Sequence, residues 1–423
     1  MPYESQIQGL RSYHPDATHE IDRGCEAVAK GLRSGCERVA KRLRKNCSLD
    51  QDDAMVSVST VINSIEQSKV PTLYLAGDLG KSACKFLYWW GDDDIQPLWL
   101  GADVVEGISE SSLRKFDAAG DLAESTWLKI GDKNILVGNS ATGYGTSFAA
   151  DKVRIAAYQA TAALGLAGIQ AGIRSYNAVV SLAVPLNEFR DRQQVAAQLQ
   201  EIGKGFIFCG QPKQFSISPS FYPEGTGLYL LHRREQASMT SAAYTRRVVV
   251  LMMGHRNLSV LVYEGGKLNA NLSQTSDLLG FWNCFKADAS AAGIRETDYN
   301  SLLAALTTGT PQQLSKVEGG LKDFSPAVEA IRQGEMKRLD SFCRDNLIDL
   351  LVGTNQTDIV IGGGVAHVLR SQLRDYFTNL GLDDRVYFAD AIGGRLLTLA
   401  EATRNAGADL ARPMRFADVY GLA

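Results

Sequence analysis

A cluster of acidic, basic and hydroxyl residues near position 80 has the chemistry needed to hold a phosphate. An apolar, β-prone run at 70–76 leads into a glycine turn, and an aromatic run at 86–90 follows it. Free backbone N–H groups in such a turn can wrap a phosphate, and a carboxylate beside them can hold a hydrated cation. Two β-prone runs joined by a glycine turn predict a hairpin. The candidate ligands in this turn are Asp78, Gly80, Lys81, Ser82 and Lys85.

A P-loop is the rival interpretation of the same turn, because Gly80-Lys81-Ser82 imitates the end of that motif. The first glycine of a P-loop would belong at position 75, which is Leu75. A P-loop also continues into a helix, whereas the aromatic run at 86–90 favours a strand. The residues therefore favour the hairpin.

A second strand–turn–strand pattern lies at 246–267 and echoes the first, as an internally duplicated fold would. Its turn contains Gly254, His255, Arg256 and Asn257. A third glycine cluster, Gly362, Gly363 and Gly364, ends a buried strand and opens a helix. Such a cluster allows a base or ribose to approach the backbone closely and presents helix N–H groups to it.

Between the two hairpins, Pro185 stops the strand predicted at 178–183. Asn187 is expected to cap the helix that follows and runs to Gln200. Glu188 then lies at a helix N-terminus just past a strand end, where side chains of α/β folds often face a ligand. The ordinary alternative is that Glu is favoured in any first helical turn.

The remaining pattern is that of an α/β protein. Strands are predicted at 98–105 and at 126–137, the latter broken by Gly131-Asp132, with a glycine-rich loop at 138–145. Helical periodicity is present at 151–173, 278–287 and 324–351. Strands that alternate with helices favour an α/β architecture.

Composition excludes several classes of protein. The 423 residues suffice for two or three domains, and no apolar run approaches the roughly 20 residues of a membrane span. Seven cysteines without a CxxC pair or a His/Cys cluster indicate reduced thiols and argue against structural zinc. No secretory signal is apparent at the N-terminus, so a cytoplasmic location is expected. The net charge of −3 predicts no direct, sequence-specific nucleic-acid binding.

Residues 1–69 read as an N-terminal extension with an 11-residue repeat. Cys25, Cys36 and Cys47 recur at that spacing, which is three helical turns, so equivalent side chains form one stripe. The segment 22–46 carries eight Lys/Arg and three Asp/Glu, a charge of +5, leaving −8 for the rest of the chain (−3 minus +5). A basic amphipathic helix indicates an anionic membrane surface, a partner protein or nucleic acid. Docking on the chain's own acidic body or on a neighbouring subunit is an equal alternative.

Over roughly residues 70–423 the chain resembles the ParM/StbA branch of the actin-like ATPases. Asp78 to Lys85 is similar to the family's first phosphate motif, in which the aspartate faces Mg²⁺ through water. Val184-Pro-Leu-Asn-Glu-Phe189 resembles the first connecting motif, whose glutamate, here Glu188, positions the attacking water. Ile361 to Gly364 resembles the adenosine motif, and Arg415 to Gly421 resembles the C-terminal return of the chain into the first domain.

The resemblance implies an α/β, actin-like fold: a duplicated, ribonuclease H-like, two-lobed architecture with a nucleotide cleft. Its first domain would span 70–180, completed by 395–423, and its second would span 181–394. It implies ATP or GTP with Mg²⁺ as cofactors, and Glu188 and Asp78 as catalytic residues.

One position departs from the family pattern. The second phosphate motif normally opens with an aspartate, and this chain has Met252 there. A thioether cannot order a metal-bound water, whereas Arg256 can bind phosphate by charge-assisted hydrogen bonds. The departure predicts slow hydrolysis and puts magnesium dependence in question.

Three functions follow as hypotheses. The first is a nucleotide-driven cytoskeletal filament with slow ATPase activity, made by self-association. It would act in plasmid or DNA segregation through a small DNA-binding adaptor, or in cell shape as membrane-associated filaments reached through residues 22–46. The second is a nucleotide-locked scaffold or adaptor with little hydrolysis. The third, a small-molecule kinase or phosphatase on the same superfold, is disfavoured because no further aspartate is placed as a catalytic base.

Overall fold

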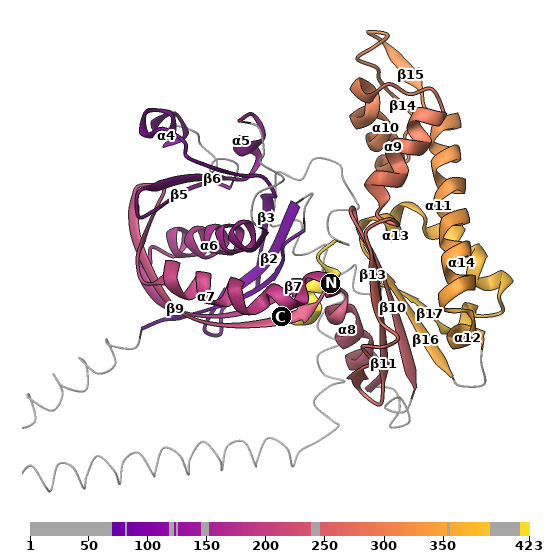
Figure 1. Ribbon diagram of the computed structural model, residues 1–423, viewed down its shortest axis with the longest axis horizontal. Coiled ribbons are helices and arrows are strands. Elements are labelled where there is room, and N and C mark those ends of the chain that lie inside the picture. The colour runs from indigo at the N-terminus through magenta and orange to yellow at the C-terminus, as the bar shows by residue number, and fades with distance from the viewer. Residues whose placement is uncertain are drawn as a thin grey trace, which may run out of the picture. The chain divides into compact units, whose positions relative to one another are not determined.

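The computed structural model describes residues 70–80, 83–117, 122–123, 126–144, 152–237, 246–352, 356–389 and 415–423 (Figure 1). The described residues from 70 onwards belong to one compact unit. The repeat of the N-terminal extension, Lys81, Ser82 and residues 395–414 of the predicted C-terminal return lie outside the described residues.

The first predicted hairpin is present. Strands β1 (Thr72–Asp78) and β2 (Ala83–Trp90) are antiparallel, and their register places Asp78 opposite Lys85. Gly77 lies opposite Phe86, and a Cβ on this glycine would lie 2.5 Å from the Phe86 ring. Glycine at 77 therefore lets a fully buried aromatic side chain lie directly on the strand that leads into the turn.

The hairpin belongs to a nine-stranded sheet of order β3-β2-β1-β7-β9-β8-β5-β6-β4. The other members are β3 (Gln96–Gly101), β4 (Val104–Glu106), β5 (Thr126–Ile130), β6 (Lys133–Val137), β7 (Ser175–Val184), β8 (Phe206–Phe208) and β9 (Gln211–Pro223). The break predicted at Gly131-Asp132 is the β5–β6 turn. Strands β1, β7 and β9 run parallel, which brings their carboxyl ends to one edge.

A second sheet repeats this pattern. Its order is β12-β11-β10-β16-β17, and its members are β10 (Arg247–Met253), β11 (Leu258–Glu264), β12 (Lys267–Leu268), β16 (Thr357–Gly362) and β17 (Val386–Phe388), with β13 (Gln274–Ser276) paired to β11. In both sheets the first three strands are antiparallel neighbours, and the next two add parallel on the other side of the first. The predicted duplication is confirmed.

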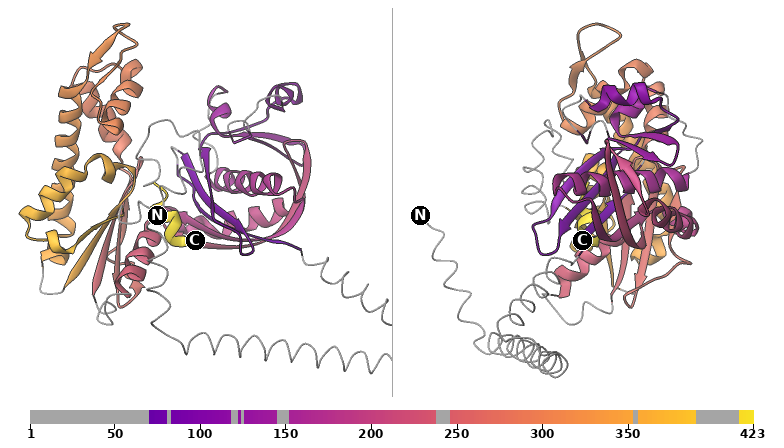
Figure 2. Two further views of the ribbon diagram at one scale, coloured as in Figure 1. Left: turned by 180° about the vertical axis from the view of Figure 1, so that it is seen from behind. Right: turned by 90° about the vertical axis from the view of Figure 1, so that its left-hand side faces the viewer.

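Helices flank both sheets (Figures 1 and 2). They are α4 (Glu110–Asp117), α5 (Asn139–Thr142), α6 (Lys152–Gln170), α7 (Arg192–Gly203), α8 (Thr226–Ala237), α9 (Phe281–Ala291), α10 (Tyr299–Thr308), α11 (Ser325–Asn346), α12 (Ile348–Val352), α13 (Gly364–Val368), α14 (Arg370–Asn379) and α17 (Ala417–Leu422), with the short 3₁₀ turns η1 (Leu186–Asp191), η3 (Glu296–Asp298) and η4 (Asp383–Arg385). A small hairpin, β14 (Gln312–Leu314) with β15 (Leu321–Asp323), follows α10.

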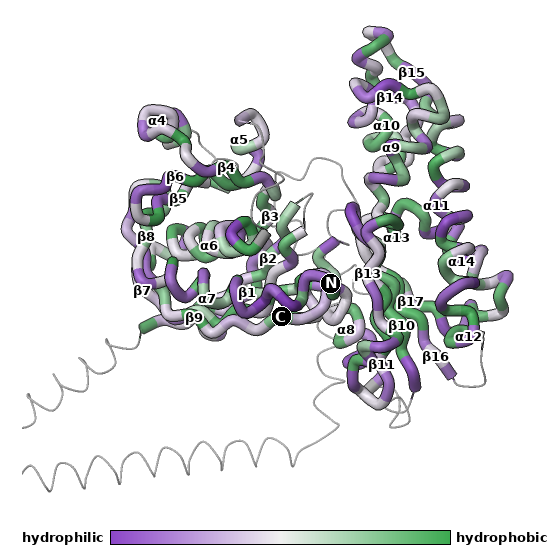
Figure 3. Tube along the Cα trace, viewed as in Figure 1, coloured by the Kyte–Doolittle hydropathy of each residue, from purple (hydrophilic) through white to green (hydrophobic). Residues whose placement is uncertain are grey.

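The predicted helices are present with three differences. The helix expected from Asn187 to Gln200 starts as the 3₁₀ turn η1 and continues as α7. The helix expected at 324–351 is two helices, α11 and α12, separated at Leu347, and the loop expected at 138–145 contains the short helix α5. Helix α6 and strands β10 and β16 are apolar along much of their length, so they lie inside the two hydrophobic cores (Figure 3). Phe86 and Phe208 are buried in the first core, and Phe285 and Phe377 in the second.

Sheet membership differs from the domain division proposed from the sequence. Strands β8 and β9, residues 206–223, pair within the sheet that contains β1, although they fall in the predicted second domain, 181–394. The change from one sheet to the other occurs between β9 and β10. Strand β9 belongs to the first sheet because it pairs parallel with β7. Local sequence patterns do not predict such a pairing between separate segments.

The C-terminal helix joins the two halves. Helix α17 contacts α8 and also strands β1 and β2. The carboxylate of Asp418 accepts hydrogen bonds from the backbone N–H groups of Gly225 (2.9 Å) and Leu228 (3.2 Å). These groups begin α8 and have no acceptor within that helix, so a residue almost 200 positions away serves as its cap.

Replacing Asp418 by Ala should destabilise the fold strongly. Two buried N–H groups would lose their acceptor, at a cost on the order of 2–4 kcal/mol. Asp418→Asn keeps one oxygen acceptor and should lose about half as much. Denaturant unfolding of the full chain measures the difference, with Asp375→Ala, an exposed carboxylate on α14, as the matched control. Equal stabilities of Asp418→Ala and the control would contradict this assignment.

Candidate functional site

The first turn places a carboxylate and an ammonium group together in a buried position. Asp78 ends β1 and forms an ion pair with Lys85, and both side chains are more than nine-tenths buried. A Cβ on Gly80 would lie 2.8 Å from the carbonyl oxygen of Ala83, so only glycine leaves this turn as tight as it is. Lys81 and Ser82, predicted to bind phosphate in the same turn, lie outside the described residues.

The second turn joins β10 to β11 at the equivalent place of the second sheet. The N–H group of Gly254 donates to the carbonyl oxygen of Asn257 at 2.9 Å, which closes the turn. The start of α9 packs on the turn from outside, because the N–H group of Trp282 donates to the carbonyl oxygen of His255 at 2.7 Å. The rings of His255 and Trp282 stack with centroids 5.0 Å apart. These contacts fix one side of the turn, and its other side lines a cavity.

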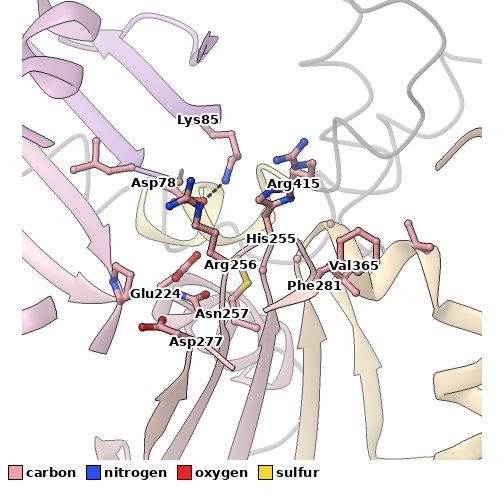
Figure 4. A pocket seen from close by; sticks show the side chains of 18 of the residues that line it. Asp78, Lys85, Glu224, His255, Arg256, Asn257, Asp277, Phe281, Val365 and Arg415 are labelled. Atoms are coloured by element: carbon pink, nitrogen blue, oxygen red, sulfur yellow. Dashed lines mark hydrogen bonds and ion pairs between the residues drawn. The ribbon is translucent and has the colours of Figure 1, made fainter. Parts of the chain in front are cut away.

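Both turns line one cavity of about 500 Å³. Among the predicted residues, it is lined by Asp78, Gly80, Lys85, Glu188, Gly254, His255, Arg256, Asn257, Gly363 and Gly364. Figure 4 shows Lys85 and Arg256 directed toward Asp78 in the space between the turns. Segments that are more than 280 residues apart in the chain thus meet, as the sequence interpretation requires.

Glu188 lines the cavity from η1, between β7 and α7. The predicted capping role of Asn187 is wrong: the helical segment has no side-chain cap, and the Asn187 amide instead points to the carboxylate of Asp277, at 3.4 and 3.5 Å. Asp277 precedes α9 and lines the same cavity. Asn187 therefore links the β7–α7 connection to the α9 end of the second sheet.

The three predicted glycines have different roles. Gly363 has φ +96°, and a Cβ there would lie 2.3 Å from the carbonyl oxygen of Met253. Gly364 opens α13 beside the side chain of Arg415. Gly362 does not line the cavity. The Leu228 side chain occupies the space beside it, and its Cδ1 would lie 2.3 Å from a Cβ on Gly362. Gly362 is thus a packing position.

The electrostatic field at the second turn is positive. Burial, and then the charges of Arg415, Arg256 and Lys85, lower the pKa of His255 to about 4, so its imidazole is neutral at pH 7. Arg415, which lies over the Trp99 ring at 4.7 Å, lines the cavity as well. Burial lowers the pKa of Arg256, whereas the carboxylates of Asp103 and Glu188 act in the opposite direction. An anion is therefore favoured at this end of the cavity.

Glu224 is a buried carboxyl group that the sequence pattern did not indicate as a ligand. It follows β9, its N–H group donates to the carbonyl oxygen of Val184 at 2.8 Å, and its side chain lines the cavity. Burial, reinforced by the negative charge of Asp78, raises its pKa to about 8, although a side-chain hydrogen bond with Asn257 opposes the rise. Its only signal in the sequence is the position between Pro223 and Gly225, which reads as an ordinary turn.

Helix α10 supplies the other end of the cavity. Asn300, Leu303, Ala304 and Thr307 line it, and their i, i+3, i+4 and i+7 spacing is that of one helix face. Phe281, Val365 and Val368 complete this largely apolar end. The cavity is thus cationic at the turns and apolar near α10, which matches a molecule with a phosphate chain and a flat base. The sequence interpretation assigned no function to residues 299–308.

The donor set fits a nucleotide better than it fits a magnesium ion. Within the described part of the chain, no three His, Cys, Asp or Glu side chains gather as a metal site. Met252 occupies the position of the family's second aspartate and is buried, and the Asp78 carboxylate already has Lys85 as its partner. The water-mediated Mg²⁺ site expected at Asp78 therefore has one carboxylate, which is engaged.

No protein-family model matches this chain, and no curated protein sequence is similar to it. Solved structures are similar. The actin-like protein Alp7A matches with a TM-score of 0.59 and 13% identity, over 83% of this chain and 94% of its own. The fold is that of the actin-like proteins.

Two further actin-like structures match over most of this chain. The archaeal actin homologue Ta0583, in a complex with ADP, has a TM-score of 0.53 at 15% identity and covers 82% of this chain and 97% of its own. A 15-stranded ParM filament from Clostridium botulinum has a TM-score of 0.52 at 15% identity and covers 72% and 91%. In this actin-like fold, no described helix is long and apolar enough to cross a membrane.

The raised pKa of Glu224 predicts a pH-dependent stability. The unfolded chain loses this proton near the ordinary pKa of 4.5, whereas the folded chain keeps it to about pH 8. Wild type should therefore lose stability as the pH rises through this window, because the folded state binds more protons. Glu224→Gln has no such loss, so its stability relative to wild type should rise by on the order of 3 kcal/mol between pH 5 and pH 8.

Thermal unfolding of both proteins across this pH range measures the effect. Glu201→Gln, an exposed carboxylate on α7, is the matched control and should track wild type at every pH. A difference between Glu224→Gln and wild type that does not change with pH would contradict the buried, protonated carboxyl group.

Proposed function

We propose that the protein is an actin-like nucleotide-binding protein that assembles into filaments. The observation that carries this proposal is the cavity shared by the turns at 78–80 and 254–257, each of which ends the first strand of its sheet. The turns supply Lys85, Arg256 and backbone N–H groups for a polyphosphate, and α10 with Phe281 supplies a surface for a base. The ADP complex of the archaeal homologue supports a nucleotide in this fold.

Assembly would follow from nucleotide binding. A ligand that contacts both sheets favours the conformation in which both turns reach it, and it shifts the population toward that conformation. If the favoured conformation has complementary surfaces at its two ends, head-to-tail contacts that do not close into rings generate a filament. The Clostridium ParM filament supports this use of the fold. The cargo that we propose is plasmid DNA, which the filament would segregate through a small DNA-binding adaptor.

Glu188 is the residue that we propose for hydrolysis. It lines the cavity, and its charge acts on Arg256 of the second turn. In the proposed step, Glu188 holds a water that attacks the γ-phosphorus while the bond to the β–γ bridging oxygen breaks, which yields nucleoside diphosphate and inorganic phosphate. Loss of the γ-phosphate then removes contacts that the filament conformation requires.

Sedimentation of the full chain with ATP, GTP, ADP or no nucleotide tests assembly. We expect pelleted polymer with a triphosphate and little with none. Negative-stain electron microscopy of the pellets distinguishes filaments from aggregates. Absence of filaments under every nucleotide condition, from a folded protein that binds nucleotide, would reject the filament proposal.

Glu188→Gln should reduce phosphate release by about 10²-fold or more, because removal of a residue that positions the reacting water typically costs this much. Polymer formed with triphosphate should persist longer in this variant. Glu201→Gln on α7 is the matched control and should behave as wild type.

A nucleotide-locked scaffold is the second candidate, and the buried Met252 in place of an aspartate favours it. The same measurement separates the two functions. Equally slow phosphate release by wild type and Glu188→Gln, with nucleotide bound in both, would reject a catalytic role for Glu188 and favour the scaffold.

A further inference from the structure

The second turn has three features that bear on how a phosphate chain would be neutralised. At its start, the side chain of Met252 is 4% exposed. It packs against Gly225, since a Cβ added to that glycine would lie 3.3 Å from the Met252 Cβ. At its tip, His255 and Arg256 face the cavity. The turn thus contains the apolar side chain of Met252 and the guanidinium group of Arg256, whereas a metal site would need a carboxylate there.

Four carboxyl groups line the cavity: Glu188 acts by its charge on Arg256 of the second turn, and the other three are engaged or neutral. Asp78 is paired with Lys85 inside the protein. Asp277 lies within 3.4 Å of the Asn187 amide. Glu224 is buried beside Asn257, and the raised pKa noted above favours its protonated form. Mg²⁺ beside a nucleotide usually takes one or two carboxylates in addition to phosphate oxygens and waters, and the engaged or neutral groups Asp78, Asp277 and Glu224 are poorly suited to that role.

Cationic groups converge on the same space from three separate segments. Lys85 comes from β2, Arg256 from the second turn, and Arg415 from the segment before α17. His255 lies among them, and burial, followed by the positive charges of Arg415, Arg256 and Lys85, lowers the pKa of its imidazole. Figure 4 shows these side chains around the part of the cavity that the two turns line. A guanidinium group binds phosphate oxygens through two parallel hydrogen bonds and needs no metal to do so.

We propose that this site binds its nucleotide without a divalent cation, with Arg256 as the main countercharge to the terminal phosphates and Lys85 and Arg415 as its partners. The inference rests on the nucleotide-binding function proposed above. In this proposal the roles of Met252 and Arg256 are linked. Met252 stands where the resembled family has an aspartate, and Arg256, four residues later, supplies a positive charge.

Isothermal titration of the full chain with ATP and with ADP, in excess Mg²⁺ and in EDTA, tests the proposal. We expect dissociation constants that agree within about threefold between the two conditions. Binding that weakens tenfold or more in EDTA would overturn metal-free binding and leave the nucleotide-binding function intact. Absence of binding in both conditions would overturn both proposals, so the two failures are distinguishable.

Two substitutions identify the groups responsible. Arg256→Gln should weaken ATP binding by tenfold or more in both conditions, and Arg256→Lys should recover part of the loss. Arg234→Gln, an exposed arginine on α8, is the matched control and should bind as wild type. Unchanged ATP binding by a folded Arg256→Gln variant would overturn the role of Arg256.

Met252→Asp tests the same idea as a gain of function. A carboxylate at the start of the second turn should make ATP binding at least tenfold tighter in Mg²⁺ than in EDTA. Circular dichroism and thermal unfolding establish that the variant is folded. If a folded Met252→Asp variant shows the same small ratio as wild type, the residue at 252 does not decide metal dependence, and the proposal fails in this part.

Discussion

The contact between Asp418 and the start of α8 is the interaction on which the arrangement of the cavity depends. One carboxylate caps a helix that packs on β10 and β16, while its own helix, α17, packs on β1 and β2. The two sheets are thereby tied at the base of the cavity. Because the capped N–H groups are buried, the contact is costly to break, and the turns above it keep their relation to one another.

The duplicated strand order explains why the functional groups meet. In each sheet the first strand has an antiparallel neighbour on one side and a parallel one on the other, so its carboxyl end lies at the same edge as that of its parallel neighbour. The turn at that edge of each sheet lines the same cavity as the corresponding turn of the other sheet. The ion pair of Asp78 with Lys85 belongs to the first turn, and Arg256 to the second.

The chemistry of the two turns is asymmetric although their topology is the same. The first turn has a carboxylate with an ammonium partner, and the second has a thioether, a neutral imidazole and a guanidinium group. A buried charge is tolerated when it is paired, and the guanidinium group remains charged even where burial lowers its pKa. The second turn is therefore suited to an anionic ligand that brings its own negative charge.

Local patterns were sufficient for the hairpins, the glycine run before α13 and the placement of Glu188 after a strand end, because strand alternation, turn chemistry and proline stops act over a few residues. The actin-like fold was predicted from the resemblance of these motifs to those of a known family. Asn187 was misjudged because its partner, Asp277, is 90 residues away. Glu224, α10 and the membership of β8 and β9 in the first sheet were decided only by tertiary structure, since burial and parallel pairing depend on distant segments.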